Sequence, residues 1–543
     1  MSKYKNSNAA IRLPLYVSIA VCVGILIGAN MAGGSLATST ELLKGLTKFR
    51  QVLTYIENDY IDDVESDDLV EGAIRSMLEQ LDPHTSYIPA KDLKIIQSQL
   101  KGNYEGIGIE FNIFKDTIHV VRPLNGGPSA KLGIRVGDKI IKIDSENVAG
   151  VNMTNQKVVE ALRGPGGSTV TVEINRTGMP NLLKFRIERD VIPQHSVDVS
   201  YMITEEIGYI KIARFANSTY TEFKDALIKL KDQGMQKLII DLTGNPGGYL
   251  NRAIQIADEL LAGRQLVVYT DGKKERYTER HYSGEKGDFE EGIVMVLVDE
   301  ESASASEIVA GALQDHDRGI IVGRRTFGKG LVQLPLDLND GSELRLTISR
   351  YYTPSGRSIQ KIYKKGSLEE YYQESYSRYQ SGELYNSDSI KTIDSLEFRT
   401  SSGRIVHGGG GISPDYFVPL DSSQESGYLN GILSTNSLQE YTVKYAQRRR
   451  EILERKGYDE FRENFSISDQ MLQDLILLTE ENELPFDQRA FNRSKKLLKQ
   501  LTKAYIARNI WDDDGFYPIY NEQDEIFQKA LQLMEKAKDL NLN

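Results

Sequence analysis

The sequence predicts a multidomain α+β protein whose domains follow one another along the chain. Three observations predict this class. The 543 residues are too many for one ordinary domain. The apolar content of 40% and the charged content of 26% are those of a globular protein. The hydrophobic pattern changes along the chain from helical spacing to strand-like alternation, and later returns to helical spacing. We therefore expect several modules in series.

Charge and residue counts exclude some classes of function. The net charge of -11 argues against nucleic-acid binding, because no basic surface is left to neutralise phosphates. The single cysteine, Cys22, cannot form an intrachain disulfide or a cysteine metal site. The six histidines show no paired spacing. We expect no metal and no cofactor.

The N-terminus, residues 1–35, predicts a membrane segment. Its apolar core, about Leu13–Ala32, is long enough to cross a bilayer as a helix. Basic residues before it would stay on the cytoplasmic side, so we expect the chain from Glu41 onward to be exported, into a periplasm. A cleaved signal peptide, giving a soluble exported form, is the alternative. The basic residues are Lys3, Lys5 and Arg12.

Residues 36–102 predict a small helical module. Residues 41–60 and 67–81 carry apolar side chains at helical spacing, and the second stretch ends at Asp82-Pro83, a natural helix stop. A further helix is expected near 90–101.

Residues 103–189 predict short strands separated by glycine turns. The Gly106-Ile107-Gly108 sequence opens the first strand, and GPSAKLGIRVGDKIIKID follows it. This order resembles a PDZ domain. The resemblance implies that backbone N–H groups of Gly106, Ile107 and Gly108 bind a peptide's C-terminal carboxylate while the peptide adds as a strand. The alternative is that these glycines only allow a tight turn.

Residues 190–420 predict a mixed α/β domain. Strands alternate with helices, which implies a largely parallel sheet with ligands at the carboxyl ends of its strands. The turn Asn245-Pro-Gly-Gly248 follows one strand, and a serine-rich run with a helix over Ser304–Asp315 follows another. Residues 361–400, rich in tyrosine and acidic side chains, are expected to be an exposed insertion.

Residues 421–543 predict a charged helical extension. Such a segment is most often solvated. It could make a homo-oligomer or bind an adaptor, and the sequence does not choose between them.

The run Glu301–Glu307 offers three candidate nucleophilic serines. A hydroxyl needs a base to take its proton before it attacks at neutral pH. The structural alternative is that Ser304 and Glu307 form a capping box at the start of an apolar helix. The same helix N-terminus would present N–H groups to a developing oxyanion. The three serines are Ser302, Ser304 and Ser306.

Lys329 is the candidate base, because burial can lower the pKa of a lysine enough to leave it neutral. The segment from Gly323 to Lys329 also matches the start of a phosphate-binding loop. Gly330 stands where that loop needs serine or threonine, and a strand-like sequence follows instead of a helix. The nucleotide interpretation is therefore disfavoured.

Histidine-based catalysis is the other enzymatic alternative. His316 lies one helix length beyond Ser304, roughly 18 Å away at the α-helical rise, and cannot reach its hydroxyl. Spacing does not exclude His281 or His407, but nothing in their context orients them.

Several blocks together resemble the carboxy-terminal processing (tail-specific) proteases. They cover about residues 40–420 and stand in the expected order, with LDPHTSYIP and the PDZ-like segment first. Thr243, where an arginine is common in DLRGNPGG, departs from the family pattern, as do the insertion and the C-terminal helices. The blocks are DLTGNPGGYL, SASASEIVAGALQD, TFGKGLVQ, RYYTPSGRSIQ and GGGISPD.

The resemblance implies an α/β core of the ClpP/crotonase type with a serine–lysine dyad. Ser304 would be the nucleophile, Lys329 the general base, and Gln333 the residue that orients the lysine. The implied peptide-coupling residue of the PDZ module is Arg163. The implied oxyanion donors are the backbone N–H groups of Ala305 and of Gly247 or Gly248.

The resemblance thus implies an exported serine endopeptidase, anchored in the cytoplasmic membrane, that cleaves proteins with free C-terminal tails. The alternative function is a catalytically silent PDZ scaffold or adaptor that binds C-terminal peptides. Intact Ser304, Lys329 and Gln333 argue against the scaffold.

Overall fold

The computed structural model describes residues 40–536, apart from residues 125, 136, 177, 285 and 391–395. The chain divides into two compact units at the boundary between Arg75 and Ser76. The predicted membrane segment, residues 1–35, lies outside the described residues. Within the described ranges, no helix is both long and apolar enough to span a bilayer.

The predicted N-terminal helices are confirmed. Helices α2 (Thr40–Asp59) and α3 (Ser66–Glu79) start with acidic residues in their first turns, which interact favourably with the helix dipole. Helix α3 ends before Asp82-Pro83, because proline cannot continue the backbone hydrogen bonding of a helix. Helix α4 (Ala90–Lys101) follows, and ends at Gly102 in the left-handed region.

The PDZ-like segment forms an antiparallel sheet of strand order β3-β4-β5-β7-β8, with β6 paired to β5. Among the described residues β3 pairs only with β4, so its other edge is open. Alternate side chains of the strands and one face of α6 fill a core of their own. The elements are β3 (Ile109–Phe114), β4 (Thr117–Pro123), α5 (Pro128–Lys131), β5 (Lys139–Ile143), β6 (Glu146–Asn147), α6 (Asn155–Leu162), β7 (Thr169–Asn175) and β8 (Leu183–Glu188).

The chain enters and leaves this segment through a two-stranded ribbon. Strand β2 (Asn103–Gly106) pairs antiparallel with β9 (Asp190–Pro193), so that Gly106 lies opposite Asp190. The ribbon connects the PDZ-like sheet to the α/β domain that follows.

The α/β domain is built on a sheet of order β10-β11-β12-β15-β16-β21, which is parallel from β11 onward. The predicted parallel sheet is therefore confirmed. Every residue of β11 is buried, because helices cover both faces of a parallel sheet. The strands are β10 (Val197–Met202), β11 (Ile207–Ile212), β12 (Lys237–Asp241), β15 (Ile293–Val298), β16 (Gly319–Gly323) and β21 (Tyr416–Phe417).

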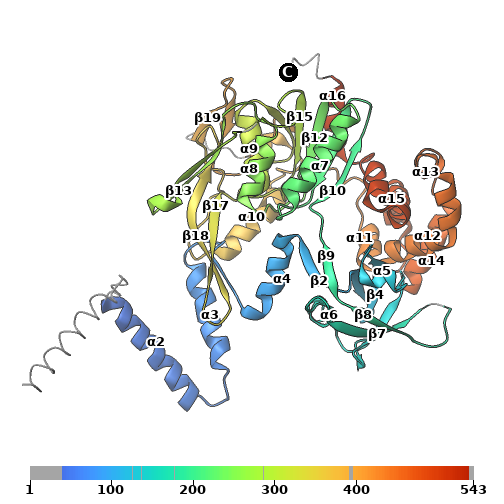
Figure 1. The fold of residues 1–543 in the computed structure, drawn as a ribbon, viewed down its shortest axis with the longest axis horizontal. Coiled ribbons are helices and arrows are strands. Elements are labelled where there is room, and N and C mark those ends of the chain that lie inside the picture. Colours follow the sequence, from blue (N-terminus) through green and yellow to red (C-terminus); the bar gives the residue numbers. More distant parts are fainter. Residues whose placement is uncertain are drawn as a thin grey trace, which may run out of the picture. The chain divides into compact units, whose positions relative to one another are not determined.

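The two faces of this sheet have separate apolar cores. Helices α7 (Thr219–Asp232), α8 (Leu250–Asp258) and α9 (Ala305–Asp315) pack together on one face (Figure 1). Helix α16 (Glu525–Glu535), close to the C-terminus, covers the other face with Phe527 and other apolar side chains. Helix α16 is thus part of the core of this domain.

A second sheet is antiparallel throughout. Strand β18 is its centre and pairs with β1, β13 and β17, while β14 pairs with β13. A small separate pair is β19 (Glu397–Arg399) with β20 (Ile405–His407). The strands of the second sheet are β1 (Ser86–Ile88), β13 (Leu266–Gly272), β14 (Glu279–Tyr282), β17 (Leu331–Asp337) and β18 (Glu343–Tyr352).

Residues 361–400 are mostly exposed where the structure describes them, as predicted, but the prediction missed several buried side chains among them. They contain helix α10 (Leu368–Gln380), whose Tyr371 is 3% exposed and whose Arg378 is 4% exposed. The charged residues Lys361 and Glu383 are buried as well. Composition suggested solvation, but these charges are buried in ion pairs, which composition cannot reveal.

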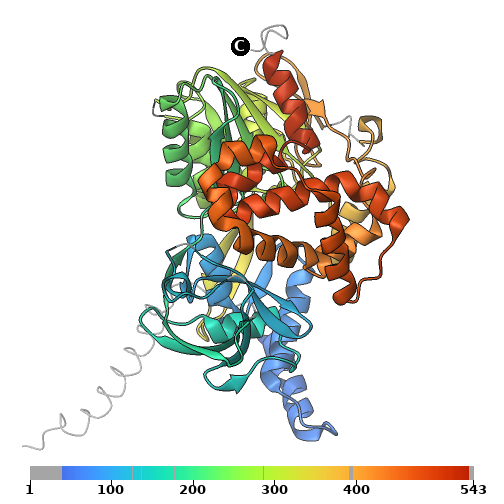
Figure 2. The same ribbon diagram turned by 90° about the vertical axis from the view of Figure 1, so that its right-hand side faces the viewer.

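The C-terminal helices have their own apolar core, centred on Leu475, Leu498 and Ile506. Helix α15 is interrupted at Trp511 and Asp512, where the backbone leaves helical geometry. Figure 2 shows this group of helices in orange to red. The helices are α11 (Gly427–Ser434), α12 (Ser437–Lys456), α13 (Tyr458–Asn464), α14 (Asp469–Glu481) and α15 (Gln488–Tyr520).

Candidate active site

Ser304 occupies the N-cap of α9, directly after the turn that leaves β15. Its backbone has φ 55° and ψ −111°, a conformation that costs a non-glycine residue free energy and that clusters at functional sites. The side chain is half-buried, whereas Ser302 and Ser306 are fully buried. Of the three serines in the run, Ser304 is therefore the one with access to solvent.

Ser302 and Ser306 hold the turn in place. The Ser302 hydroxyl donates to the carbonyl of Leu242 at 2.8 Å, and the Ser306 hydroxyl donates to the carbonyl of Asn245 at 3.0 Å. These bonds join the turn that carries the three serines (the serine turn) to the turn Asn245–Gly248 that follows β12 (the glycine turn).

The glycine turn lies directly against Ser304. A Cβ added at Gly247 would lie 2.7 Å from the Cβ of Ser304 and 2.6 Å from the carbonyl oxygen of Ala303. A Cβ added at Gly248 would lie 2.1 Å from the carbonyl oxygen of Phe215. Both positions also have positive φ, so only glycine fits without displacing the backbone.

Two of the three candidate oxyanion donors have N–H groups that are not already engaged. The N–H of Gly247 donates to Asn245 Oδ1 at 2.8 Å. The N–H of Gly248 makes no hydrogen bond within the described part of the chain. Ala305 is the first residue of α9, where an N–H has no intrahelical acceptor. The geometry thus favours Gly248 over Gly247 as the partner of Ala305.

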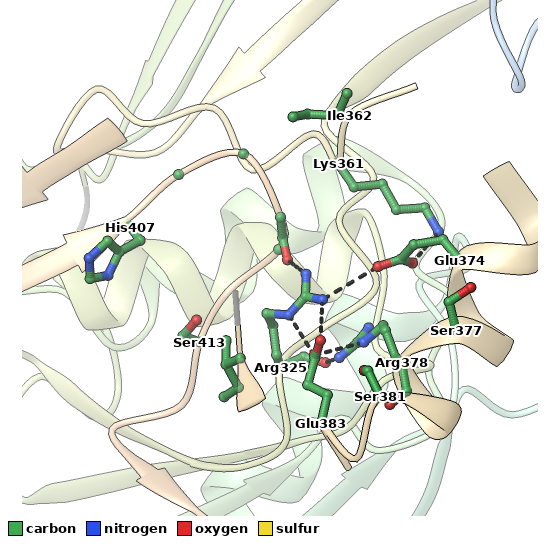
Figure 3. A pocket seen from close by; sticks show the side chains of 15 residues that line it. Arg325, Lys361, Ile362, Glu374, Ser377, Arg378, Ser381, Glu383, His407 and Ser413 are labelled. Carbon is green, nitrogen blue, oxygen red and sulfur yellow. Dashed lines mark hydrogen bonds and ion pairs between the residues drawn. The ribbon is translucent and has the colours of Figure 1, made fainter. Parts of the chain in front are cut away.

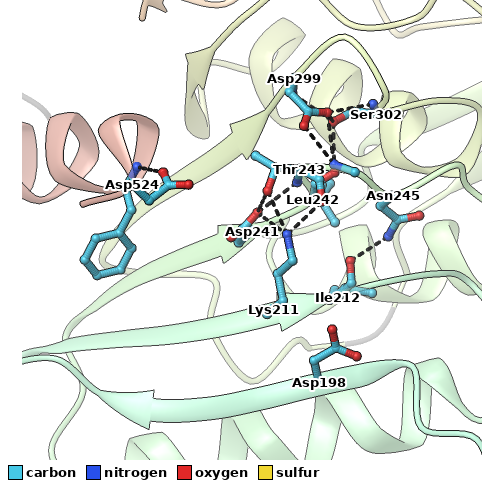
Figure 4. A network of polar contacts seen from close by, with 12 residues as sticks. Asp198, Lys211, Ile212, Asp241, Leu242, Thr243, Asn245, Asp299, Ser302 and Asp524 are labelled. Carbon is cyan, nitrogen blue, oxygen red and sulfur yellow. Dashed lines mark hydrogen bonds and ion pairs between the residues drawn. The ribbon is translucent and has the colours of Figure 1, made fainter. Parts of the chain in front are cut away.

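A network of buried polar side chains supports the glycine turn from the sheet side (Figure 4). Lys211 Nζ donates to Asp241 Oδ1 at 2.9 Å and to the carbonyl and hydroxyl oxygens of Thr243, each at 2.7 Å. Asp299 accepts the N–H of Gly244 at 3.0 Å. Lys211 therefore supplies a cation beside Thr243, the position at which the chain departs from the family's common arginine.

Glu307 connects the serine turn to the loop between β16 and β17 that carries Lys329 (the lysine loop). Its carboxylate, fully buried, accepts hydrogen bonds from the N–H of Ser304 at 2.8 Å, of Gly328 at 2.7 Å and of Lys329 at 2.9 Å. The hydroxyl of Thr326 also donates to it at 2.5 Å. Burial raises the pKa of Glu307, and these donors oppose that shift by stabilising the carboxylate.

Tyr351 of β18 joins the same two segments from the other sheet. Its hydroxyl donates to the carbonyl of Lys329 at 2.6 Å and lies 3.1 Å from the carbonyl oxygen of Ser304. The backbones of Ser304 and Lys329 are thus fixed to each other through two buried side chains.

Lys329 stands in surroundings that favour its neutral form. Burial lowers its pKa from the ordinary value of 10.5, and the nearby Arg345 lowers it further, while Glu307 and Asp82 oppose the shift. Its Nζ donates to Gln333 Oε1 at 3.2 Å. Among the described residues, no hydrogen bond joins Nζ to the Ser304 hydroxyl. The two residues are linked through Glu307 at their backbones and not through their side chains.

The segment before β1 completes the surroundings of the lysine. The amide of Gln333 donates to the carbonyl of His84. Asp82 accepts hydrogen bonds from Thr85 and from Thr347 of β18, which fixes this turn against the second sheet. Burial and the charge of Lys329 lower the pKa of His84 to about 4. The role of His84 was not predicted; LDPHTSYIP is the one sequence signal that points to it.

The alternative chemistries find no support in the geometry. His316 lies at the C-terminal end of α9, where Nε2 contacts the carbonyl of Leu266 at 2.7 Å. Residues 331–337 form strand β17, so the expected helix of a nucleotide-binding loop is absent there. His281 lies near Glu279 in the second sheet. No cluster of metal-binding side chains occurs within the described ranges.

The candidate peptide-binding residues lie together at the open edge of the PDZ-like sheet. Gly106 ends β2, and Ile107 and Gly108 form the loop that leads into β3. Gly108 has φ +69°, and the carbonyl of Ile107 accepts from both the N–H and the hydroxyl of Ser129. This loop is therefore held from its carbonyl side.

Arg163 ends α6 and lies next to Gly106. A Cβ at Gly106 would lie 3.5 Å from Arg163 Cγ. The guanidinium stands 4.5 Å from the ring centre of Tyr104 and donates to Ser98 Oγ at 2.8 Å. Arg163 thus connects the Gly106–Gly108 loop with helix α4, outside the PDZ-like sheet.

Family models match four parts of the chain. Residues 206–366 match peptidase family S41, residues 119–176 match a PDZ domain, and residues 29–92 match the N-terminal domain of the activating protease CtpB. Residues 428–512 match a family of unknown function.

Curated relatives cover most of the same region. The carboxy-terminal-processing protease of Bartonella bacilliformis is 37% identical over 348 residues, which are 62% of this chain and 79% of the relative. CtpB, the carboxy-terminal processing protease of Bacillus subtilis, is 35% identical over 330 residues, 59% of this chain and 67% of the relative.

Solved structures of related proteins align with parts of the chain. The photosystem II D1 C-terminal processing protease is 26% identical, with a TM-score of 0.35 and coverage of 69% of this chain and 87% of its own. The peptide-bound PDZ domain of a Vibrio cholerae carboxy-terminal protease is 29% identical, with a TM-score of 0.15 and coverage of 17% and 97%. With its S41 peptidase domain and its PDZ domain, the chain belongs to the family of carboxy-terminal processing serine proteases.

Proposed function

We propose that this serine peptidase is an endopeptidase with Ser304 as nucleophile and Lys329 as general base, and that its PDZ domain selects substrates by their C-terminal tails. The observation that carries the proposal is the buried carboxylate of Glu307, which binds the backbone N–H of both residues. An apolar helix cap alone would not need a second segment with a half-buried lysine attached to it.

The proposed reaction has two steps. Neutral Lys329 takes the proton from Ser304 Oγ as that oxygen bonds to the peptide carbonyl carbon. The N–H groups of Ala305 and Gly248 donate to the oxyanion, each contributing about 3–4 kcal/mol in comparable sites. The C–N bond then breaks and Lys329 gives its proton to the leaving amine. Water attacks the acyl-enzyme in the same way, and Ser304 is released.

The resting arrangement requires one adjustment before catalysis. Lys329 Nζ donates to Gln333, so the side chain must turn toward Ser304 when substrate binds. Catalytic hydrogen bonds are often long or misaligned in a substrate-free enzyme and tighten in the complex. Gln333 would then orient the amine during the turn.

The PDZ domain would present the substrate tail. The open edge of β3 can accept an added strand, and the loop at Gly106–Gly108 offers backbone N–H groups for a terminal carboxylate. Arg163, between this loop and α4, would transmit tail binding toward the protease domain.

Location is also part of the proposal. The basic N-terminus and the apolar run after it would anchor the protein in the cytoplasmic membrane, with the protease domain outside the cytoplasm, in the periplasm. The C-terminal helices would serve a homo-oligomer or an adaptor.

The test of the nucleophile is acylation. A serine-reactive acylating probe should label the wild-type protein and fail to label Ser304→Ala, while Ser302→Ala keeps the label if it folds. Cleavage of an unstructured peptide should disappear in Ser304→Ala with the melting temperature preserved. Turnover or labelling retained in Ser304→Ala would exclude this residue as nucleophile. A wild-type protein that neither cleaves the peptide nor takes the label would support the alternative function, a catalytically silent PDZ scaffold.

The test of the base is the pH dependence of kcat/KM. Because only the neutral amine can accept a proton, activity should rise with pH through the pKa of Lys329, which burial places below 10.5. Lys329→Arg should lose activity, since a guanidinium stays charged. A flat profile over this range would contradict a titrating lysine.

Tail recognition predicts an effect of the substrate's terminal carboxylate. Amidating that carboxylate removes the charge that the Gly106–Gly108 loop would bind, so kcat/KM should fall by about tenfold or more. The matched comparison is the same peptide amidated on an internal side-chain carboxylate. Equal cleavage of the free and amidated tails would contradict the recognition mechanism.

Glu307→Gln should distinguish two effects of Glu307, which are the alignment of the lysine loop and the effect of its charge on the pKa of Lys329. The new amide would face backbone N–H groups, so the lysine loop would move and kcat should fall by about 100-fold. Because the Glu307 charge raises the pKa of Lys329, its removal should shift the ascending limb of the pH profile to lower pH. Glu301→Gln, an exposed acid in the same run, is the control and should change neither quantity.

A further inference from the structure

Helix α10 lies outside every matched family model, yet it reaches the lysine loop. The match to peptidase family S41 ends at residue 366, and α10 begins at Leu368. We define Lys361–Glu383 as the α10 segment. Its buried side chains make two separate sets of contacts with the residues around Lys329.

The first set holds the backbone of the loop. Arg378 donates through Nη1 to the carbonyl of Thr326 at 3.2 Å and through Nη2 to the carbonyl of Arg325. Its Nε donates to Glu383 at 2.9 Å, and Glu383 also pairs with Arg325 Nε at 2.8 Å. The α10 segment therefore binds carbonyl groups of a loop whose N–H groups at Gly328 and Lys329 bind Glu307.

The second set reaches the amine of Lys329 through side chains. The hydroxyl of Tyr371 bonds to His84 Nε2 at 2.8 Å. The carbonyl of His84 accepts from Gln333, and Gln333 accepts from Lys329 Nζ. The ammonium of Lys361 also lies 4.1 Å from the ring centre of Phe327 in the loop and 4.2 Å from that of Tyr371.

Polar contacts make up much of the link between the α10 segment and the lysine loop, because a pocket of about 400 Å³ lies beside these contacts (Figure 3). Arg325, Arg378 and Glu383 line the pocket together with the glycine run Gly408–Gly411. The open space removes apolar packing on that side. Losing the guanidinium of Arg378 would therefore leave solvent as the only partner of the loop carbonyls from this direction.

We propose that the α10 segment positions the Lys329 loop, with Arg378 and Tyr371 as positioning residues for the general base. The inference rests on the proposed function, because it assumes that Lys329 is the base. It adds helix α10, which lies outside the matched family models, to the elements that support the catalytic site. In this protein the loop is held from its N–H side by Glu307 and from its carbonyl side by Arg378.

The test compares Arg378→Gln, Arg378→Lys and Tyr371→Phe with wild type. Arg378→Gln should lower kcat by about 10- to 100-fold with little change in KM, because a loosened loop misplaces the amine. Solvent would reach Lys329, so the ascending limb of the pH profile should move to higher pH. Arg378→Lys should recover part of kcat, and Tyr371→Phe should show a smaller loss in the same direction.

The design leaves in place the charges that face Lys329, which are Arg345 of β18, Glu307 of α9 and Asp82 before β1, and the titratable His84 beside them. Lys365→Ala, which removes an exposed cation of the same segment, is the control and should match wild type.

Two results would overturn the inference. One is unchanged kcat in Arg378→Gln, and the other is a lower kcat with an unmoved pH limb, which indicates only a smaller folded fraction. Failure of the proposed function would look different, because wild type itself would lack the ascending limb and the Ser304-dependent label.

Discussion

The buried carboxylate of Glu307 is the interaction on which the candidate active site depends. Serine turn and lysine loop come from different parts of the fold, one after β15 and the other between β16 and β17. Glu307 binds backbone N–H groups of both, so one side chain sets their separation. A charged group that is fully buried is stable only with such a set of donors. Burial of the lysine in the same loop also lowers the pKa of Lys329.

The parallel sheet supplies the second constraint. Strands β12 and β15 are neighbours, so the turns at their carboxyl ends meet at one edge. Glycine at 247 lets the first turn approach Ser304, and the side chains of Ser302, Ser306 and Asp299 hold the two turns together. The positions of the Ser304 hydroxyl and of the oxyanion donors are therefore set by turns that are bonded to each other.

Much of the architecture could be predicted from the sequence because it follows from local patterns. Residue alternation predicted the strands of the PDZ domain, the succession of strands and helices predicted the parallel sheet, and the Asp82-Pro83 stop predicted the end of α3. Gly330 and the alternating residues after it correctly predicted a strand instead of a nucleotide-binding loop. Ser304 and Lys329 were singled out by motif, and the structure places their backbones beside the same carboxylate.

The remainder depends on contacts that local patterns do not contain. Glu307 has the sequence of an ordinary helix cap, and its bonds to residues 326–329 arise only in the fold. From composition alone, residues 361–400 are expected to be exposed, because charged residues that are buried in ion pairs, such as Arg378 and Glu383, cannot be told from surface charges. His84 and Tyr371 are 287 positions apart, and no spacing rule connects them.

The central claim is that this buried loop holds an amine of lowered pKa beside Ser304. The most direct measurement is the NMR titration of the wild-type protein with ¹³C-labelled lysine side chains, in which the Lys329 signal is assigned by its loss in Lys329→Arg. The account predicts that Lys329 titrates at a lower pH than the exposed lysines and below its ordinary value of 10.5. A Lys329 signal that titrates together with the exposed lysines would contradict it.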